Sequence, residues 1–343
     1  MNIVVSETNE IFKLLDKKEN NFFDEKKILL LGSDGFLGRY FVEYFNKLNN
    51  EKIKVFVDCV DNNISSNRIE KKKIRKNFTF YKTNINKFNL KKKYDLIIFL
   101  AGIADPSIYK KLPLDALEVS YIGVSKFIKK AKNDKSTFIF FSSSEIYGNP
   151  SIKNIPTKES YYGNVNSYGP RACYDEGKRV GETLCYIYNT YLKTKTKIIR
   201  PFNIFGPGMG PDDGRVVPRF VRAIRSQKPM TIYNHGKQTR TFCYIVDAMI
   251  GFLKVIVSGK DGEIYNVGNN LEEISMNKLA KILTSLTQYK TIIKKINYPS
   301  SYPSNEPMRR CPDLHKIKKH TRYTPKIKLK DSLKRFLESY MND

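Results

Sequence analysis

Cysteine is scarce in this sequence, and its five residues are scattered without the spacing of metal ligands. An odd number of isolated cysteines argues against a disulfide framework and against a zinc site. The first 25 residues also lack an apolar segment, so we expect no signal peptide and no membrane partner. We expect reduced thiols in a cytoplasmic protein without a bound metal, at Cys59, Cys173, Cys185, Cys243 and Cys311.

Acidic residues are also few, because 34 Asp and Glu stand against 61 Lys and Arg and leave a net charge of +27. Such an excess is compatible with a nucleic-acid or anionic membrane partner. However, the runs Lys71 to Lys73 and Lys91 to Lys93 lie in separate connecting segments and belong to no recognisable nucleic-acid module. We therefore interpret the lysines as a solvated surface, expect no nucleic-acid partner, and expect the field to attract a small anionic substrate.

Hydrophobic residues make up 41% of the 343 residues, which is enough for a substantial core and excludes a disordered chain. The length fits one large domain or two closely joined domains, and internal repeats are absent. Near the start of the chain, the segment Ile11 to Leu15 predicts a short amphipathic helix.

A glycine-rich turn follows the first strongly apolar run. The run from Lys27 to Leu31 predicts a buried parallel strand, and a helix-like stretch extends from the turn to about Leu48. A strand, a glycine turn and a helix in this order form the dinucleotide fingerprint, in which the backbone approaches a pyrophosphate at a helix N-terminus. We expect the cofactor to contact Gly32, Gly35, Phe36, Leu37 and Gly38.

The next apolar run, from Ile53 to Val60, ends at Asp61 and Asn62. An acid at this place accepts hydrogen bonds from the adenosine ribose and repels a 2′-phosphate, which predicts NAD as the cofactor. Asp58 is the alternative acid. We favour Asp61 because Asp58 would lie within the strand, whereas Asp61 lies at its end.

Strands and helices then alternate, with strands predicted at 78–81, 95–100 and 137–142 and a helix from about Leu114 to Ala131. This alternation predicts an α/β fold with a Rossmann-type doubly wound parallel sheet, whose ligands bind at the carboxyl ends of the strands. Five residues follow such strand ends and are expected beside the cofactor: Asn84, Ile85, Leu100, Ala101 and Gly102.

Tyr174 and Lys178 lie four residues apart in a helix predicted from Pro170 to about Leu192, so they share one face. The same spacing occurs at Tyr191/Lys195 and Tyr233/Lys237, so the context must decide between a site and an ordinary surface pair. We expect the Lys178 ammonium to favour the Tyr174 phenolate and make it a general base.

A serine run, Ser142 to Ser144 followed by Glu145, ends the strand before this helix. A hydroxyl of this run, facing Tyr174, can hydrogen-bond the substrate oxygen that is oxidised. Glu145 adds an ionisable group beside the reacting carbon. A polar loop without function is the alternative interpretation.

Together these segments resemble the extended short-chain dehydrogenases/reductases, the NAD-dependent epimerase/dehydratase family, which act on nucleotide sugars. Within that family the chain is most similar to the UDP-glucuronate decarboxylases. The stretches that carry the resemblance are 162–185, 200–207, 213–218, 238–242 and 309–313.

The resemblance implies NAD-dependent oxidation at C4 of the sugar, loss of carbon dioxide, and return of the hydride. It implies a homodimer and three parts of the chain: an extension (1–25), an NAD-binding domain (26–200), and a smaller C-terminal α/β substrate-binding region (201–343) with some segments returning to the Rossmann domain. By resemblance Tyr174 is the base, Lys178 also holds the nicotinamide ribose, and Ser143, Ser144, Glu145 and Arg240 complete the catalytic set. The implied substrate-binding residues are Tyr109, Asn203, Arg215, Tyr233, Arg240 and Arg310.

One departure keeps other reactions open, because Gly208 stands where such decarboxylases usually carry Arg. A dehydratase of the GDP-mannose type is one alternative. A 4-epimerase is another, although epimerases generally lack an acid at Glu145. The Ser144-Glu145 pair argues against dehydratases of deoxythymidine-diphosphate glucose, which carry Asp-Glu there. A non-catalytic nucleotide-sugar-binding protein is the alternative of another class, although the catalytic residue types are all present.

Overall fold

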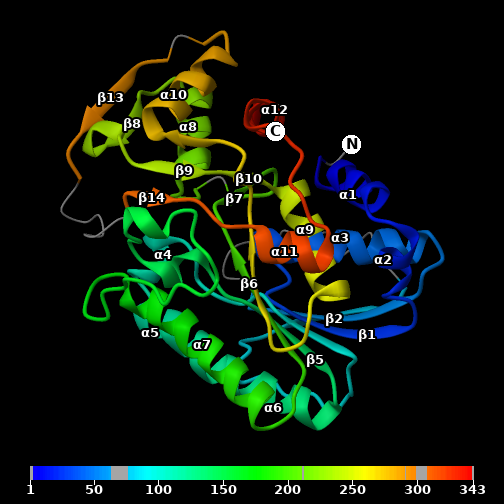
Figure 1. Ribbon diagram of the computed structural model, residues 1–343. Helices are drawn as coiled ribbons and strands as arrows, with labels where there is room; N and C mark the ends of the chain where they lie inside the picture. Colours follow the sequence, from blue (N-terminus) through cyan, green and yellow to red (C-terminus); the bar gives the residue numbers. More distant parts are fainter. Residues whose placement is uncertain (1–2, 63–75, 211, 290, 299–306, 342–343) are drawn as a thin grey trace.

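The computed structural model describes residues 3–62, 76–210, 212–289, 291–298 and 307–341. Its centre is a seven-stranded parallel sheet with the order β11-β6-β5-β4-β1-β2-β3 (Figure 1). The strand bounds are β1 Lys26–Leu31, β2 Val55–Asp61, β3 Phe78–Lys82, β4 Leu96–Phe99, β5 Thr137–Phe141, β6 Thr196–Pro201 and β11 Ile264–Val267. The predicted doubly wound sheet is therefore confirmed.

The sheet is buried on both faces because its strands are apolar at successive positions. In β1, for example, Ile28 and Leu30 pack into one hydrophobic cluster while Leu29 and Leu31 pack into the other. The strand order changes direction at β1, which lies between β2 and β4. In such sheets this switch point opens the crevice that binds ligands.

Helices cover the two faces separately (Figure 1). On one face lie α3 (Phe36–Asn50) and α9 (Ile245–Ser258), and on the other lie α6 (Val124–Asp134) and α7 (Ala172–Thr190). The helix predicted from 114 to 131 is observed as α5 (Pro113–Glu118), a π-turn, η2 (Val119–Gly123), and α6. The helix that carries Tyr174 begins at Ala172, two residues after the predicted start at Pro170.

The beginning of the chain is more structured than expected. In place of the predicted short helix, the structure has α1 (Ile3–Leu14) and α2 (Lys17–Asn21). A capping box joins them, since the Glu19 N–H donates to Asp16 at 2.8 Å and the Asp16 N–H donates to Glu19 at 2.9 Å. Val4 and Ile11 are buried in the same cluster as α3 and α9, so this extension belongs to the core.

The C-terminal part contributes β11 to the main sheet and α9 to one of its faces, and it also builds a smaller α/β layer beside the sheet (Figure 1). That layer contains the sheets β12-β9-β14, β13-β8 and β10-β7. The division of the chain near residue 201 remains a prediction. The remaining bounds are α4 Pro106–Tyr109, η3 Ser144–Tyr147, η4 Ile152–Asn154, β7 Ile204–Phe205, α8 Val216–Arg225, β8 Met230–Tyr233, η5 Asn234–Gly236, β9 Thr239–Thr241, β10 Cys243–Tyr244, β12 Glu273–Ser275, α10 Met276–Ser285, β13 Ile293–Ile296, β14 Arg309–Arg310, α11 His315–Thr321 and α12 Leu329–Met341.

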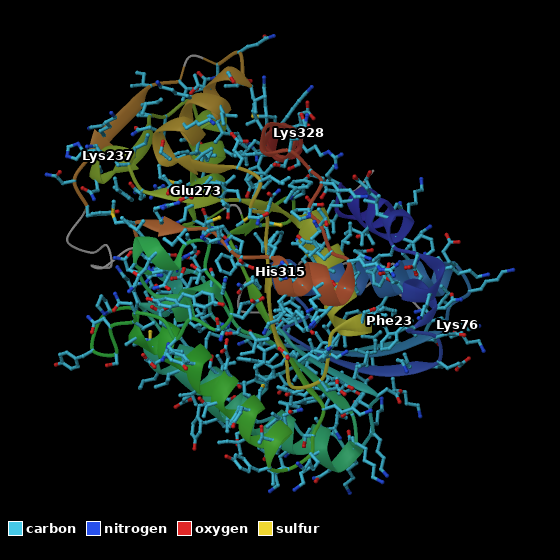
Figure 2. All side chains as sticks on the ribbon, in the orientation of Figure 1. Phe23, Lys76, Lys237, Glu273, His315 and Lys328 are labelled. Carbon is cyan, nitrogen blue, oxygen red and sulfur yellow. The ribbon has the colours of Figure 1, made fainter. Side chains whose placement is uncertain are left out.

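Lys76 and Lys237 lie at opposite edges of the view in Figure 2, and both are exposed. Lys178 and Lys197, in contrast, are buried. The predicted run Lys71 to Lys73 lies outside the described residues. All five cysteines are free thiols. Among the residues that the structure describes, no helix has the length and apolar character needed to cross a membrane.

Candidate active site

The glycine loop closes tightly on the end of β4. Gly32 has a φ of +88°, and a Cβ there would lie 2.7 Å from the backbone nitrogen of Ala101. A Cβ at Gly38 would lie 2.1 Å from the Gly32 carbonyl oxygen. Gly35 caps α3 without a side-chain hydrogen bond. The backbone N–H groups of the first turn of α3 are thus available to an anion, as a dinucleotide pyrophosphate requires.

The two candidate ribose-binding acids have different surroundings. Asp61 is the last residue of β2, and its carboxylate accepts a hydrogen bond of 2.9 Å from the Asp34 N–H in the glycine loop. Asp58 is buried, and its carboxylate accepts hydrogen bonds from the Tyr94 hydroxyl at 2.6 Å and from Lys92 at 3.0 Å. This geometry favours Asp61, whose contact with the ribose remains a prediction.

We expect Asp61→Ala to narrow the preference for NAD over NADP by about tenfold or more, a change of about 1.4 kcal/mol. The reason is that a carboxylate at this position meets the 2′-phosphate of NADP as a like charge. Dissociation constants of both cofactors, measured by fluorescence titration, test this expectation. Asp58→Asn is the matched control and should leave the ratio unchanged. If only Asp58→Asn narrowed the preference for NAD over NADP, Asp58 would be the acid that binds the ribose.

Tyr174, Ser143 and Lys178 meet where β5 ends and α7 begins. Tyr174 is 6% exposed and hydrogen-bonds Ser143. Lys178 lies one turn further along α7, where its Nζ donates to the Phe141 carbonyl at 2.8 Å and lies 5.9 Å from the centroid of the Tyr174 ring. A Cβ at Gly102 would lie 3.1 Å from that Nζ, so the β4 segment expected beside the cofactor adjoins Lys178.

The expected effect of Lys178 on Tyr174 stays a prediction, and burial dominates the Tyr174 pKa in the protein by itself. Burial raises the pKa of Tyr174 to about 12, and Glu145 and Asp175 add to this rise. The hydrogen bond to Ser143 opposes the rise but does not outweigh it. Burial also lowers the pKa of Lys178 to about 8. Tyr174 therefore keeps its proton at neutral pH until another positive charge is placed beside it.

Glu145 is held between two arginines. Arg310 donates to both carboxylate oxygens, at 2.5 and 2.8 Å, and Arg171 also bonds Oε2. Burial alone would raise the pKa of Glu145, but the two guanidinium groups hold it well below its usual range. The pKa of Asp175 shifts in the opposite direction to that of Glu145. Asp175 lies 3.6 Å from Arg171, but burial and the Glu145 charge raise its pKa to about 7.

Tyr109 packs on Tyr174, the candidate base. The Tyr109 and Tyr174 rings are stacked, with centroids 5.6 Å apart and an interplanar angle of 8°. Tyr109 is 1% exposed, and its hydroxyl has no hydrogen-bond partner among the described residues. Burial raises the pKa of this hydroxyl above its ordinary value. Tyr109 therefore contacts Tyr174, and the substrate contact implied for it remains a prediction.

A cavity of about 550 Å³ opens beside Glu145. Its lining holds seven Lys and Arg side chains against two carboxylates, which favours a ligand with several negative charges. Six of the predicted residues line it: Glu145, Asn203, Arg215, Tyr233, Arg240 and Arg310. Ser144 is buried at the start of η3 and, like Ser143 and Tyr174, is not part of this lining, so its catalytic role stays a prediction.

Arg215 connects the cavity to the glycine loop. It pairs with Asp213 through its Nε at 2.9 Å, and its guanidinium lies 6.0 Å from the centroid of the Phe36 ring. Arg219 also lines the cavity, and its guanidinium lies 4.4 Å from the centroid of the Tyr233 ring. The cavity thus has cations on α8, one turn of helix apart, next to an aromatic face.

Sequence reasoning missed several residues of the lining. Arg171 precedes Tyr174 by three residues and Asp175 by four, which is the spacing of neighbours on a helix and could have indicated it. Arg219 follows Arg215 by the same four-residue spacing. Lys110 and Lys111 were treated as surface lysines, although both line the cavity.

The profile of the NAD dependent epimerase/dehydratase family matches residues 28–268, which is more than half of the chain. The chain belongs to this family. Membership confirms the resemblance inferred from the sequence. It also agrees with the glycine loop and with NAD as the cofactor.

Curated members of the family are similar over nearly the whole chain. UDP-glucuronic acid decarboxylase 6 of Arabidopsis thaliana is 34% identical over 320 residues, which cover 92% of this chain and 89% of the relative. UDP-glucuronic acid decarboxylase 1 of Danio rerio is 32% identical over 322 residues, which cover 93% of this chain and 74% of the relative.

Solved structures share the fold. UDP-glucuronic acid 4-epimerase from Bacillus cereus, in complex with UDP-glucuronic acid and NAD, has a TM-score of 0.79 at 24% identity, with 92% of this chain and 99% of that chain covered. A dTDP-glucose 4,6-dehydratase from Streptomyces venezuelae, with NAD bound, has a TM-score of 0.79 at 20% identity, with 92% and 97% covered.

Proposed function

We propose that the protein is an NAD-dependent decarboxylase that converts UDP-glucuronate to UDP-xylose through a 4-keto intermediate. The observation that carries the proposal is the position of Glu145. Its carboxylate is bonded by Arg171 and Arg310 at the edge of a cation-rich cavity, and its charge acts on the pKa of Tyr174. The curated relatives named as UDP-glucuronic acid decarboxylases support the same substrate.

The residues at the switch point fit NAD. The glycine loop leaves room for a pyrophosphate at the start of α3, and Lys178 lies next to Gly102. Asp61 is the proposed ribose acceptor. When bound, NAD supplies the hydride acceptor for C4 of the sugar and a positive charge next to the phenol.

Tyr174 acts as the base for the first step. Its oxygen is hydrogen-bonded to Ser143, and a nearby positive charge that lowers its pKa would favour loss of its proton to solvent. The resulting phenolate accepts the proton of the sugar 4-hydroxyl. Lys178 supports the phenolate from the next turn of α7. Ser143 bonds the same substrate oxygen and keeps it directed at Tyr174.

Decarboxylation follows from the chemistry of the oxidised sugar. A ketone at C4 makes the carboxylate on C5 a β-keto acid, so the electrons of the broken C–C bond pass into an enolate as carbon dioxide leaves. The cations near Glu145, among them Arg240, stabilise that negative charge. C5 then takes up one proton. The returned hydride adds to C4, and Tyr174 gives back the proton that it took from the 4-hydroxyl, which restores the alcohol.

A substrate labelled at the carboxyl carbon tests the proposal directly. UDP-glucuronate labelled there should release labelled carbon dioxide and form UDP-xylose, without net consumption of NAD. Label retained in every product would overturn decarboxylation. In parallel incubations with GDP-mannose and deoxythymidine-diphosphate glucose, release of water would identify a dehydratase. Formation of an epimer of UDP-glucuronate would identify an epimerase.

We also propose a homodimer in the cytoplasm. Apolar side chains are exposed along α5 and η2, including Leu114 at 70% and Tyr121 at 54%, and such an apolar patch favours a protein interface. The free thiols agree with a reducing compartment. Sedimentation equilibrium distinguishes the dimer from a monomer.

A further inference from the structure

Helix α1 lies outside the residues matched by the family profile, yet several of its side chains are buried in the core. Glu7 is only 3% exposed although it carries a carboxyl group. The Tyr244 hydroxyl bonds Oε1 of Glu7, and the Tyr40 hydroxyl lies 3.4 Å from Oε2. Tyr40 belongs to α3, the helix of the glycine loop, and Tyr244 belongs to β10. Glu7 therefore joins the cofactor side of the fold to the substrate side.

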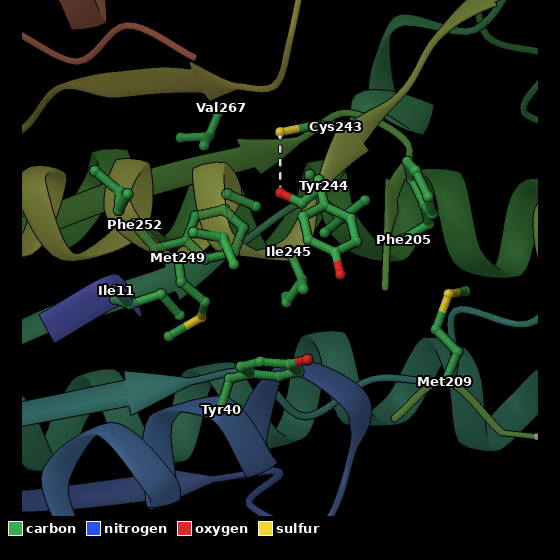
Figure 3. Close-up of a cluster of buried hydrophobic side chains, with 14 of the residues drawn as sticks. Ile11, Tyr40, Phe205, Met209, Cys243, Tyr244, Ile245, Met249, Phe252 and Val267 are labelled. Carbon is green, nitrogen blue, oxygen red and sulfur yellow. Dashed lines mark hydrogen bonds between the residues drawn. The ribbon is translucent and has the colours of Figure 1, made fainter. Parts of the chain in front are cut away.

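Tyr40 also has a second acceptor. Its hydroxyl donates to the Pro207 carbonyl at 2.9 Å. A tyrosine hydroxyl has only one hydrogen to donate, so Glu7 and Pro207 compete for it. Figure 3 shows Tyr40 and Tyr244 on opposite sides of the buried cluster, with the Tyr244 hydroxyl directed toward Tyr40.

Pro207 belongs to the loop 206–210, which reaches the substrate cavity through Met209. The Tyr340 hydroxyl, on α12, lies 3.1 Å from the Met209 and Gly210 carbonyl oxygens. Helix α1 touches the same loop, because a Cβ at Gly208 would lie 3.5 Å from Val4. The loop is thus held by α1, α3 and α12, and Tyr40 provides the contact that depends on Glu7.

We propose that Glu7 is a positioning residue that makes the hold of Tyr40 on the loop 206–210, and through this loop the binding of the nucleotide sugar, dependent on pH. The link to nucleotide-sugar binding rests on the proposed function. An ionised carboxylate is a stronger acceptor than a neutral carboxyl group, so it draws the Tyr40 hydrogen away from Pro207. Rising pH therefore loosens the loop.

The charges around Glu7 place this change near neutral pH. Burial raises the pKa of Glu7 to about 7, although the hydrogen bond from Tyr244 and the charge of Arg335 on α12 lower it. Glu10, on the same helix, adds to the rise, and the contact with Tyr40 opposes it. These are the titratable and charged groups that face Glu7 from α1, α3, β10 and α12.

The methyl group of Met209 provides a test that does not depend on turnover. In protein labelled with ¹³C-methyl methionine, the Met209 signal, assigned with Met209→Leu, should shift between pH 6 and 8 with a midpoint near the pKa of about 7. Glu7→Gln should abolish the shift. Glu10→Gln is the matched control, because it removes another carboxylate of α1, one that pairs with Arg335 on α12. That variant should retain the shift.

Binding of UDP to the NAD-loaded protein gives the second measurement. UDP affinity should fall by roughly threefold to tenfold more from pH 6 to 8 in the wild type than in Glu7→Gln, the scale of one hydrogen bond. Comparing variants cancels the titration of UDP itself. Tyr40→Phe should weaken UDP binding at both pH values and abolish the Met209 shift, which keeps the test available if Glu7→Gln does not fold.

Two outcomes overturn the proposal: a Met209 signal that does not titrate in the wild type, or one that titrates equally in Glu7→Gln. Failure of the proposed function looks different, because UDP would then fail to bind at any pH while the Met209 signal still titrates.

Discussion

Tyr174→Phe is expected to lower turnover of the nucleotide sugar at least about a hundredfold, the usual scale for the loss of a general base. The substitution keeps the ring that stacks on Tyr109 and removes only the hydroxyl that bonds Ser143. NAD affinity should therefore stay nearly unchanged. Single-turnover absorbance at the reduced-nicotinamide band, after addition of UDP-glucuronate, measures the oxidation step directly.

The same chain offers a matched control. Tyr191 and Lys195 repeat the four-residue spacing, but Tyr191 is 67% exposed at the end of α7. Tyr191→Phe should behave like the wild type. Turnover within a few fold of the wild type in Tyr174→Phe would reject the base assignment, whatever the control shows.

Features that depend on neighbouring residues could be predicted from the sequence. The strand β1, the glycine loop and α3 form one continuous segment, so their order and residue types are enough to predict a dinucleotide-binding turn. Tyr174 and Lys178 share a helix, and Ser143 ends the strand before it. Topology rules then brought these segments to one edge of the sheet, because parallel strands end on the same side.

Contacts between distant segments could not be predicted in this way. Glu145 and Arg310 are 165 residues apart, and no periodic pattern in the sequence indicates that they pair. The rise in the Tyr174 pKa could not be predicted for a related reason. It comes from burial and from the charges of Glu145 and Asp175, and both depend on the packing of the folded chain. The contact of Glu7 with Tyr244 joins residues 237 apart.

Arg310→Ala is expected to lower kcat on the order of a hundredfold, the scale of one lost charge-stabilising group in an active site. Arg310 is 7% exposed, and both arms of its guanidinium bond Glu145. Without Arg310, Glu145 retains its bond to Arg171 but loses the two hydrogen bonds that fix its orientation. Breaking a buried pair typically costs about 3–5 kcal/mol, so thermal unfolding must be measured alongside kinetics.

The division of the effect between kcat and KM decides what Arg310 does. If it holds the diphosphate, as the resemblance implies, KM should rise while kcat stays near the wild-type value. If it orients Glu145, as the hydrogen bonds favour, kcat should fall with little change in KM. Arg309→Ala is the matched control, since this neighbour on β14 pairs with Glu273 and its side chain is 39% exposed. Its loss should leave both constants near wild type, because exposed pairs contribute only about 0–1 kcal/mol. If both variants changed kcat and KM equally, β14 would act on the site through its backbone. The Arg310 side chain would then not be what orients Glu145.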